Sequence, residues 1–312
     1  MTEEEYLEVI AARGMIQERL GMLRPPEGVS EGQLPAGPPE GENAENKIIY
    51  YDTLDALLMA LNAGDIENIE IYQSVARYLC ATNENLLLGP GFDTDKTTET
   101  FANLVQNGIF GNDLSFLMME DNTTLRDEFN SAISDMKADG TLDRLVKEQI
   151  DDLIDGEEIQ SIELPHFDGA ETIKVAVTGA LPPMDYVAAD GTPAGFNTAV
   201  LAEIGKRTGK NIEIVVVDSI GRATALASGA VDAVFWTRTS SLAQEMTDLT
   251  QEEREAKIAK DQTSMTEEEI RLLDELNESI GASVYAGADK PEGTIVTEPY
   301  FSDVLVPVIL AR

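Results

Sequence analysis

The sequence contains few of the residues that carry catalytic and metal chemistry. Its 312 residues include one cysteine, Cys80, one histidine, His166, and one tryptophan, Trp236. A single cysteine excludes an internal disulfide and a cysteine metal cluster, and a solitary histidine lacks the partners that nucleophilic or metal chemistry requires. The acidic clusters lack the spacing of a calcium loop. We therefore expect no catalytic residue, no metal site and no cofactor.

Positive charge and long apolar runs are also scarce. Lys and Arg number 22 against 58 Asp and Glu, which gives a net charge of -36. Such an acidic chain repels the phosphates of nucleic acids and anionic lipids. No apolar stretch approaches the roughly 18 to 20 residues of a membrane span, and the start "MTEEEYLEVI" is acidic where a signal peptide is basic and then apolar. We expect no nucleic-acid partner, no direct membrane insertion and no export signal within these residues.

The apolar residues that are present, 43% of the chain, suffice for the cores of two lobes. Residues 3–23 carry apolar side chains near helical spacing, which predicts a helix. The members of this pattern are Leu7, Ile10, Met15, Leu20 and Leu23. Residues 24–46 are rich in Pro, Gly and Glu and bury too little to order themselves. We expect residues 1–46 to form an N-terminal helix and a linker.

Residues 47–155 show the alternation of strands and helices that is typical of an α/β domain. The predicted strands are "KIIYY", "IENIEIY" and "DLSFLMME". The first predicted helix, "TLDALLMALNAG", has an N-cap at Thr53 and a stop at Gly64. A second helix follows in "QSVARYLCAT", and residues 123–150 predict two helices that break at Asp139-Gly140.

A connector, residues 156–171, separates this domain from a second α/β domain at 172–312. The predicted strands are "TIKVAVTG", "NIEIVVVD" and "VDAVFW", and the predicted helices are "NTAVLAEIGKRTG" and "IGRATALASG". Consecutive apolar residues in a strand indicate that helices cover both faces of a mostly parallel sheet with right-handed crossovers. Residues 242–282 interrupt this domain, and their charge predicts solvated helices with a capping box at Thr266.

The order of residues resembles one known family. The stretches "IKVAVTGALPPMDYVAADGTPAGFNTAVLAEIGKRTGKNIEIVVVD", "ALASGAVDAVFW" and "TEPYFSDVLVPV" resemble the first lobe of the family 3 extracellular solute-binding proteins. The stretches "IIYYDTLDALLMALNAGDIENIEIYQSVARYL" and "LRDEFNSAISDMKADGTLDRLVKEQI" resemble the second lobe. The resemblance implies an α/β, two-lobed periplasmic-binding-protein-like fold of type II, with mostly parallel sheets flanked by helices.

The two lobes stand in reversed order along this chain. This order corresponds to a circular permutation, or to a window cut across two tandem copies. A permutation costs little where the termini of a domain lie close together. The first strand of the second lobe has no counterpart that the sequence reveals.

The resemblance implies that a ligand lies between the lobes, beside loops that follow the strands. The positions that fit in the first lobe are Thr178, Met184, Tyr186, Trp236, Thr237, Arg238, Thr239 and Tyr300, and those in the second lobe are Tyr72 and Gln73. A guanidinium at Arg238 suits a bidentate pair with a carboxylate. The alternatives are that Arg238 is a surface residue, that Tyr72 only packs, and that Trp236 is a core residue.

The sequence departs from the family pattern at both residues that would bind the two ends of the ligand. The arginine that binds the ligand carboxylate usually lies a few residues after Arg238, where this chain has Gln244, and the acid that receives the ligand amino group falls at Tyr72. A tyrosine stacks or hydrogen-bonds, but it does not neutralise an ammonium group at neutral pH. The altered ends lower the expectation that the ligand is an amino acid.

The resemblance implies a non-enzymatic, extracytoplasmic protein that captures a small polar ligand, amino-acid-like or a related organic acid. Its partner would be the permease of an ABC-type importer or a receptor. One alternative is an enzyme similar to the cyclohexadienyl dehydratases, which needs a positioned carboxylic acid and a cationic clamp, here Asp185 and Arg238. Another is an interaction or sensor domain whose pocket is filled by its own side chains.

Overall fold

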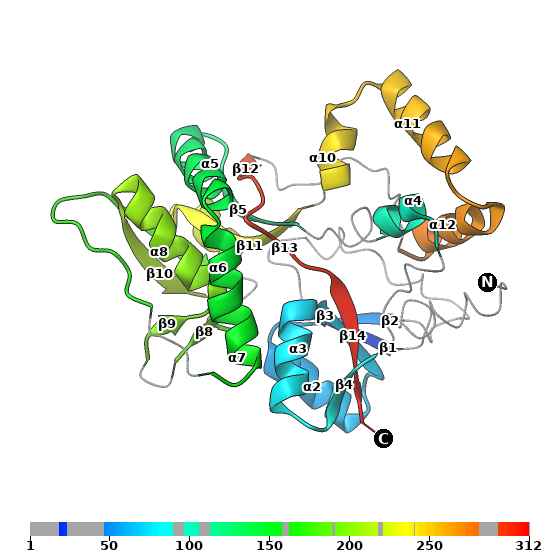
Figure 1. The fold of residues 1–312 in the computed structure, drawn as a ribbon, viewed down its shortest axis with the longest axis horizontal. Helices are drawn as coiled ribbons and strands as arrows, with labels where there is room; N and C mark the ends of the chain where they lie inside the picture. Colours follow the sequence, from blue (N-terminus) through cyan, green and yellow to red (C-terminus); the bar gives the residue numbers. More distant parts are fainter. Residues whose placement is uncertain are drawn as a thin grey trace.

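The structure is a computed structural model. It describes residues 19–23, 47–89, 97–105, 113–157, 162–188, 191–217, 221–239, 241–280 and 293–311. Helices flank two β-sheets (Figure 1), as predicted, but the sheets are mixed and not mostly parallel, because each includes an antiparallel strand from the other half of the chain. In the described part of the chain, no helix is both long enough and apolar enough to cross a membrane.

The first sheet has five strands in the order β2-β1-β3-β14-β4. Their bounds are β1 Arg19–Leu23, β2 Lys47–Tyr51, β3 Asn68–Tyr72, β4 Leu86–Leu88 and β14 Leu305–Leu310. Strand β1 is parallel to β2 and to β3, and β14 is antiparallel to β3 and β4. Helices α2 (Leu54–Ala63) and α3 (Gln73–Thr82) pack against this sheet and bury Leu57, Val75 and Leu79.

The second sheet repeats this arrangement, in the order β10-β6-β11-β5-β12 with β13 paired to β5. Its strands are β5 Asp113–Met119, β6 Thr172–Val177, β10 Asn211–Val216, β11 Ala233–Thr239, β12 Thr294–Val296 and β13 Phe301–Ser302. Strands β10, β6 and β11 are parallel, whereas β5 runs antiparallel to its neighbours. A small third sheet contains β7 Ala180–Leu181, β8 Asp185–Val187 and β9 Pro193–Ala194.

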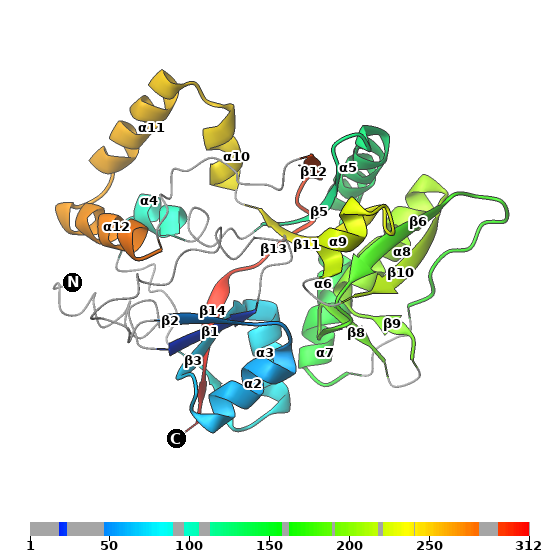
Figure 2. The same cartoon turned by 180° about the vertical axis from the view of Figure 1, so that it is seen from behind.

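Helices cover the second sheet on both sides (Figures 1 and 2). They are α5 (Thr123–Ala138), α6 (Thr141–Val146), α8 (Phe196–Thr208) and α9 (Gly221–Ala227). A π-helical turn, Lys147–Asp151, and α7 (Asp152–Ile154) continue α6 toward α3 of the first sheet. One apolar cluster extends through both halves and includes Leu57, Ile69, Phe129, Ile173 and Phe196.

The sheets exchange one strand each across the predicted domain division. Strand β5 belongs to residues 47–155, yet it pairs with β11, β12 and β13 of the C-terminal half. Strand β14 ends the chain, yet it pairs with β3 and β4 of the N-terminal half. Each sheet therefore contains an antiparallel strand of the other half that lies between two strands of its own half.

The prediction of a helix through residues 3–23 is wrong at its C-terminal end. Residues 19–23 form β1, which lies between β2 and β3 at the position where the sequence revealed no strand. A Cβ atom at Gly21 would lie 2.3 Å from Ile66 Cδ1 and 2.7 Å from Leu57 Cδ1, so only glycine fits under α2. Pairing on both sides satisfies the backbone of this segment, and this tertiary context overrides its helical spacing. The rest of the predicted N-terminal helix and the linker lie outside the described residues.

Within the insertion 242–282, the described residues, which end at 280, are helical, but only part of them is solvated. Its helices are α10 (Ser241–Asp248), α11 (Gln251–Thr263) and α12 (Glu267–Ile280). Helix α11 buries no residue, as predicted. Helices α10 and α12 instead pack with α4 (Glu99–Asn103) around Phe101, Met246 and Leu272, because each carries an apolar stripe. The predicted capping box is present, since Thr266 N and Oγ1 donate to Glu269 Oε2 at 2.8 and 3.0 Å.

Candidate functional site

The loop after β6 is fastened by the carboxylate of Asp185. Thr178 N, Thr178 Oγ1 and Gly179 N donate hydrogen bonds to Asp185 Oδ2 at 3.0, 2.8 and 2.9 Å. Asp185 is the first residue of β8 and is only 2% exposed. This carboxylate therefore fixes the predicted ligand residue Thr178 relative to the neighbouring strand, which carries Tyr186.

Asp185 is also an unusual acid. Burial raises the pKa of its carboxyl from the ordinary 3.8 to about 6, although the three donors and the nearby Arg222 act in the opposite direction. Arg222, on α9, is itself 5% exposed and donates to the Phe235 carbonyl oxygen at 3.4 Å. The second carboxyl oxygen, Asp185 Oδ1, is buried and accepts no hydrogen bond from any described residue. A raised pKa and an unpartnered oxygen mean that this carboxyl exchanges a proton in mildly acidic solution.

Tyr186 lies where the two halves of the molecule meet. Its hydroxyl is buried without a hydrogen-bond partner among the described residues. Burial raises the pKa of this hydroxyl, and so does Tyr78, which belongs to α3 on the other sheet. The neighbouring Met184 is completely buried in the core. Of these two predicted ligand residues, Tyr186 therefore lies near Tyr78 of the opposite lobe, whereas Met184 is buried in the core.

The opposite lobe contributes the N-terminus of α3. Tyr72 ends β3 and is half-buried, and Gln73 begins α3 with an exposed side chain. The Gln73 amide donates to the Val304 carbonyl oxygen at 2.8 Å, and the Ser74 amide donates to Asp303 Oδ2 at 3.0 Å. A carboxylate is favourable at a helix N-terminus, so Asp303 occupies the place that a bound anion would take.

Asp303 also connects the two sheets, because it lies between β13 and β14. Burial raises the pKa of its carboxyl to about 6, while the hydrogen bonds from Ser74 and Val304 and the charge of Arg77 act to lower it. Its side chain therefore holds the crossing strand against α3. Nothing in the local sequence signals this role, since Ser74 is 229 residues away.

The sequence predicted a turn at Trp236–Ser240, but residues 236–239 belong to a strand. Strand β11 continues through Thr239 and pairs antiparallel with β5, with Thr237 opposite Ser115 and Thr239 opposite Asp113. The reason is the strand contributed by the other half, which offers β11 a partner that the sequence does not reveal. The side chains of Trp236, Thr237, Arg238 and Thr239 lie outside the described part of the structure, as does residue 240.

Tyr300 lies in the core of the second sheet. It is 2% exposed, and its hydroxyl donates to Asn197 Oδ1 at 3.1 Å. Its ring lies 4.7 Å from that of Phe116, measured between centroids. Tyr300 therefore joins the start of α8 to the segment that precedes β13, and it also lines a surface pocket.

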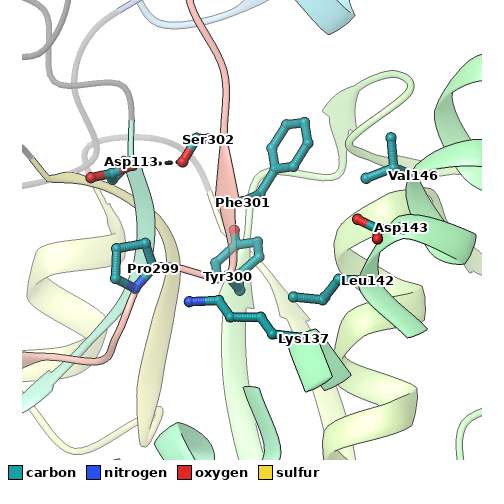
Figure 3. A pocket seen from close by; sticks show the side chains of 9 residues that line it. All are labelled: Asp113, Lys137, Leu142, Asp143, Val146, Pro299, Tyr300, Phe301 and Ser302. Atoms are coloured by element: carbon teal, nitrogen blue, oxygen red, sulfur yellow. Dashed lines mark hydrogen bonds between the residues drawn. The ribbon is translucent and has the colours of Figure 1, made fainter. Parts of the chain in front are cut away.

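This pocket lies between β13 and helices α5 and α6 (Figure 3), and we call it the β13–α6 pocket. Its volume is about 670 Å³. Its lining residues are Asp113, Lys137, Leu142, Asp143, Val146, Pro299, Tyr300, Phe301 and Ser302. Ser302 Oγ donates to Asp113 Oδ1 at 2.6 Å and closes one end. Tyr300 is the one lining residue that the sequence predicted, because the others, on α5, α6, β5 and the segment around β13, carried no site signal.

The described residues contain no group of three or more His, Cys, Asp or Glu side chains that could hold a metal ion. The chemistry that the described site offers is therefore hydrogen bonding by tyrosine hydroxyls and backbone amides, together with two buried carboxyls of raised pKa.

Residues 173–287 match the family model "Bacterial extracellular solute-binding proteins, family 3". No curated protein matches the chain. Among solved structures, the ligand-binding component of an ABC-type import system from Staphylococcus aureus, with zinc bound, is 10% identical. It has a TM-score of 0.36, and the match covers 94% of this chain and 65% of that one, so this chain spans less than two thirds of that protein.

Two further structures show a comparable degree of similarity. A probable amino-acid ABC transporter extracellular-binding protein from Bacillus subtilis is 10% identical, with a TM-score of 0.33 and coverage of 94% of this chain and 83% of that one. The GluR0 ligand-binding core from Nostoc punctiforme, in complex with L-glutamate, is 12% identical, with a TM-score of 0.31 and coverage of 95% and 85%. TM-scores at this level say nothing about the ligand of this chain.

Proposed function

We propose that this chain, whose residues 173–287 match the model of the bacterial extracellular solute-binding proteins of family 3, captures a small polar solute between its two lobes. The ligand would be amino-acid-like or a related organic acid. One lobe would contribute Thr178 and Tyr186, and the other would contribute Tyr72 and Gln73.

The observation that carries this proposal is the Tyr186 hydroxyl. It is buried between elements of the two lobes, it has no hydrogen-bond partner among the described residues, and Tyr78 of the opposite lobe acts on its pKa. A buried hydroxyl without a partner costs free energy, which a polar group of a ligand recovers when it binds there. Thr178, fixed by Asp185, follows the last residue of β6, and Tyr186 follows Asp185 in β8.

The ligand clamp that we propose differs from one built on a helix N-terminus. Asp303 already accepts from the Ser74 amide at the start of α3, so a ligand carboxylate finds no free amide at Ser74. We propose that the guanidinium of Arg238 binds the carboxylate and that the hydroxyl of Tyr186 and the exposed side-chain amide of Gln73 bind the uncharged polar groups. This arrangement favours organic acids with hydroxyl or amide groups over simple zwitterions.

Titration calorimetry and thermal-shift measurements test the proposal against amino acids, opines, small peptides and organic acids. We expect at least one class to bind, and we expect Tyr186→Phe to weaken binding about fivefold to tenfold, which corresponds to the loss of one hydrogen bond. Tyr51→Phe, on β2 and away from the lobe boundary, is the matched control. A folded protein that responds to no ligand, or equal binding by the two variants, would contradict the proposal.

We propose further that the partner of this chain is a membrane permease of an ABC-type importer or a receptor, at an extracytoplasmic location. The support is the family match, since binding proteins of this kind deliver their solute to such partners. Ligand-dependent binding of this chain to a permease in lipid nanodiscs would test this step, and the Tyr186→Phe variant would need more solute for the same response.

A second candidate is an interaction or sensor domain that binds no solute. The observation in its favour is Asp303, whose carboxylate fills the N-terminus of α3 as a bound anion would. If this alternative holds, Asp303→Asn leaves the protein unresponsive to every solute of the panel, whereas a solute-binding protein retains its response. The dehydratase alternative depends on the buried acid Asp185, and incubation with prephenate or arogenate tests it by turnover.

A further inference from the structure

The β13–α6 pocket carries opposite charges that are not used elsewhere. Lys137 comes from the last turn of α5 and Asp143 from the first turn of α6. Neither side chain forms an ion pair or a hydrogen bond with another described residue. Asp113, the other acid of the pocket, already accepts a hydrogen bond from Ser302. The pocket therefore presents one ammonium group and one carboxylate that remain available to a ligand.

The lining of the pocket also includes apolar side chains. Leu142 and Val146 of α6 lie on one side of the pocket and Phe301 on the other, and the buried Tyr300 also contributes to the lining (Figure 3). Aromatic rings prefer to meet other rings at an offset or edge to face, which favours an aromatic group in this space. A volume of about 670 Å³ lies within the range of about 300 to 1,000 Å³ that is typical of small-molecule sites.

The pocket is separate from the proposed solute site. Thr178, Tyr186, Tyr72 and Gln73 do not line it. It lies beside β13, directly before Asp303 and the strand that crosses to the other sheet. A ligand there would contact both the crossing segment and α6.

We propose that the β13–α6 pocket is a second ligand site and that it binds a small zwitterion with an aromatic body, such as an aromatic α-amino acid. The carboxylate of the ligand pairs with Lys137, its ammonium group pairs with Asp143, and its ring packs between Phe301 and Leu142. The two charges are what select a zwitterion, because an anion alone leaves Asp143 unpaired and a cation alone leaves Lys137 unpaired.

Three probes of equal ring size separate the two charge contacts. They are phenylalanine, 3-phenylpropionate, which lacks the ammonium group, and 2-phenylethylamine, which lacks the carboxylate. Titration calorimetry measures each probe against the full chain and against the variants Lys137→Gln and Asp143→Asn. Both positions are exposed at the surface, so these variants retain the fold. Lys260→Gln, at an exposed lysine of α11, is the control for the loss of a positive charge.

We expect Lys137→Gln to weaken the binding of phenylalanine and of 3-phenylpropionate about threefold and to leave the binding of 2-phenylethylamine unchanged. Asp143→Asn should weaken the binding of phenylalanine and of 2-phenylethylamine about threefold and leave the binding of 3-phenylpropionate unchanged. Lys260→Gln and Tyr186→Phe should leave all three probes unchanged. Absence of binding by all three probes would overturn the proposal, as would equal effects of the two pocket variants on every probe. If only Tyr186→Phe, and neither pocket variant, weakens the binding of phenylalanine, the probe binds at the site between the lobes and the proposal is overturned.

Discussion

Replacing Asp185 by asparagine should make the protein more stable at neutral pH. Burial raises the pKa of this carboxyl from 3.8 to about 6 in the folded chain. At 1.36 kcal/mol per pKa unit, the ionised carboxylate costs the folded state about 3 kcal/mol relative to the protonated form. An asparagine oxygen accepts from the amides of Thr178 and Gly179 as the carboxylate does, and it carries no charge.

The sign of the pH dependence follows from proton binding. Below about pH 4 the carboxyl of Asp185 is protonated in both the folded and the unfolded chain, and well above pH 6 it is ionised in both. Between these limits the folded chain binds more protons, so the free energy of unfolding falls as the pH rises. The stability that Asp185 contributes is therefore present at low pH and is lost as the pH rises through about 6, the folded-state pKa.

Urea unfolding followed by circular dichroism at pH 4 and pH 7 measures this effect. We expect Asp185→Asn to match the original protein at pH 4 and to exceed its free energy of unfolding by up to about 3 kcal/mol at pH 7. Asp135→Asn, which removes one exposed carboxylate of α5, controls for the change in net charge. If Asp185→Asn is no more stable at pH 7, or if its advantage is the same at both pH values, then burial does not set the pKa of Asp185.

Three further substitutions test other parts of the fold. Gly195→Ala should lower the free energy of unfolding by at least about 1 to 3 kcal/mol in urea titrations, because φ is 100° at this residue and a Cβ atom would lie 2.6 Å from the Met184 carbonyl oxygen. Phe129→Ala should cost about 3 to 5 kcal/mol in the same assay, since the ring is fully buried, and an effect below 1 kcal/mol would mean that the core is not packed as described. Thr266→Ala should cost about 1 kcal/mol through loss of the capping box with Glu269, which amide hydrogen exchange would locate in α12; unchanged exchange there would refute the role of the cap.

Most of the helices and strands could be predicted from the sequence, because their signals are local. Helix α2 begins after Thr53, whose hydroxyl accepts from the Ala56 amide at 3.1 Å, and ends at Gly64, whose φ is 78°. Both residues are the types that helix ends require. The apolar runs of β6 and β10 likewise predicted strands, although β10 lies at the sheet edge and its Val216 is exposed, so coverage on both faces was not predicted correctly there.

The strand exchange could not be predicted from local signals. Val306 pairs with Ile71 and Val234 pairs with Leu117, and neither partner is near the other in sequence. The same limit explains β1, whose five residues acquire strand conformation only because β2 and β3 flank them.

Only part of the candidate site could be predicted from the sequence. Loops that follow strands are recognisable, and this rule selected Thr178 and Tyr186. The contacts that determine their behaviour, such as the effect of Tyr78 on Tyr186, join segments that are distant in the chain. The β13–α6 pocket is a similar case, since Lys137 and Asp143 look like ordinary surface charges until β13 is placed opposite them.

The exchange of β5 and β14 means that neither half of this chain is a complete folding unit. A cut within the connector 156–171 would leave the N-terminal fragment without β14, so β3 and β4 would lose the strand between them and expose unpaired edges. The C-terminal fragment would lose β5 in the same way. Expressed apart, the two fragments should aggregate, and mixed together they should repair each other's sheets and restore one protein.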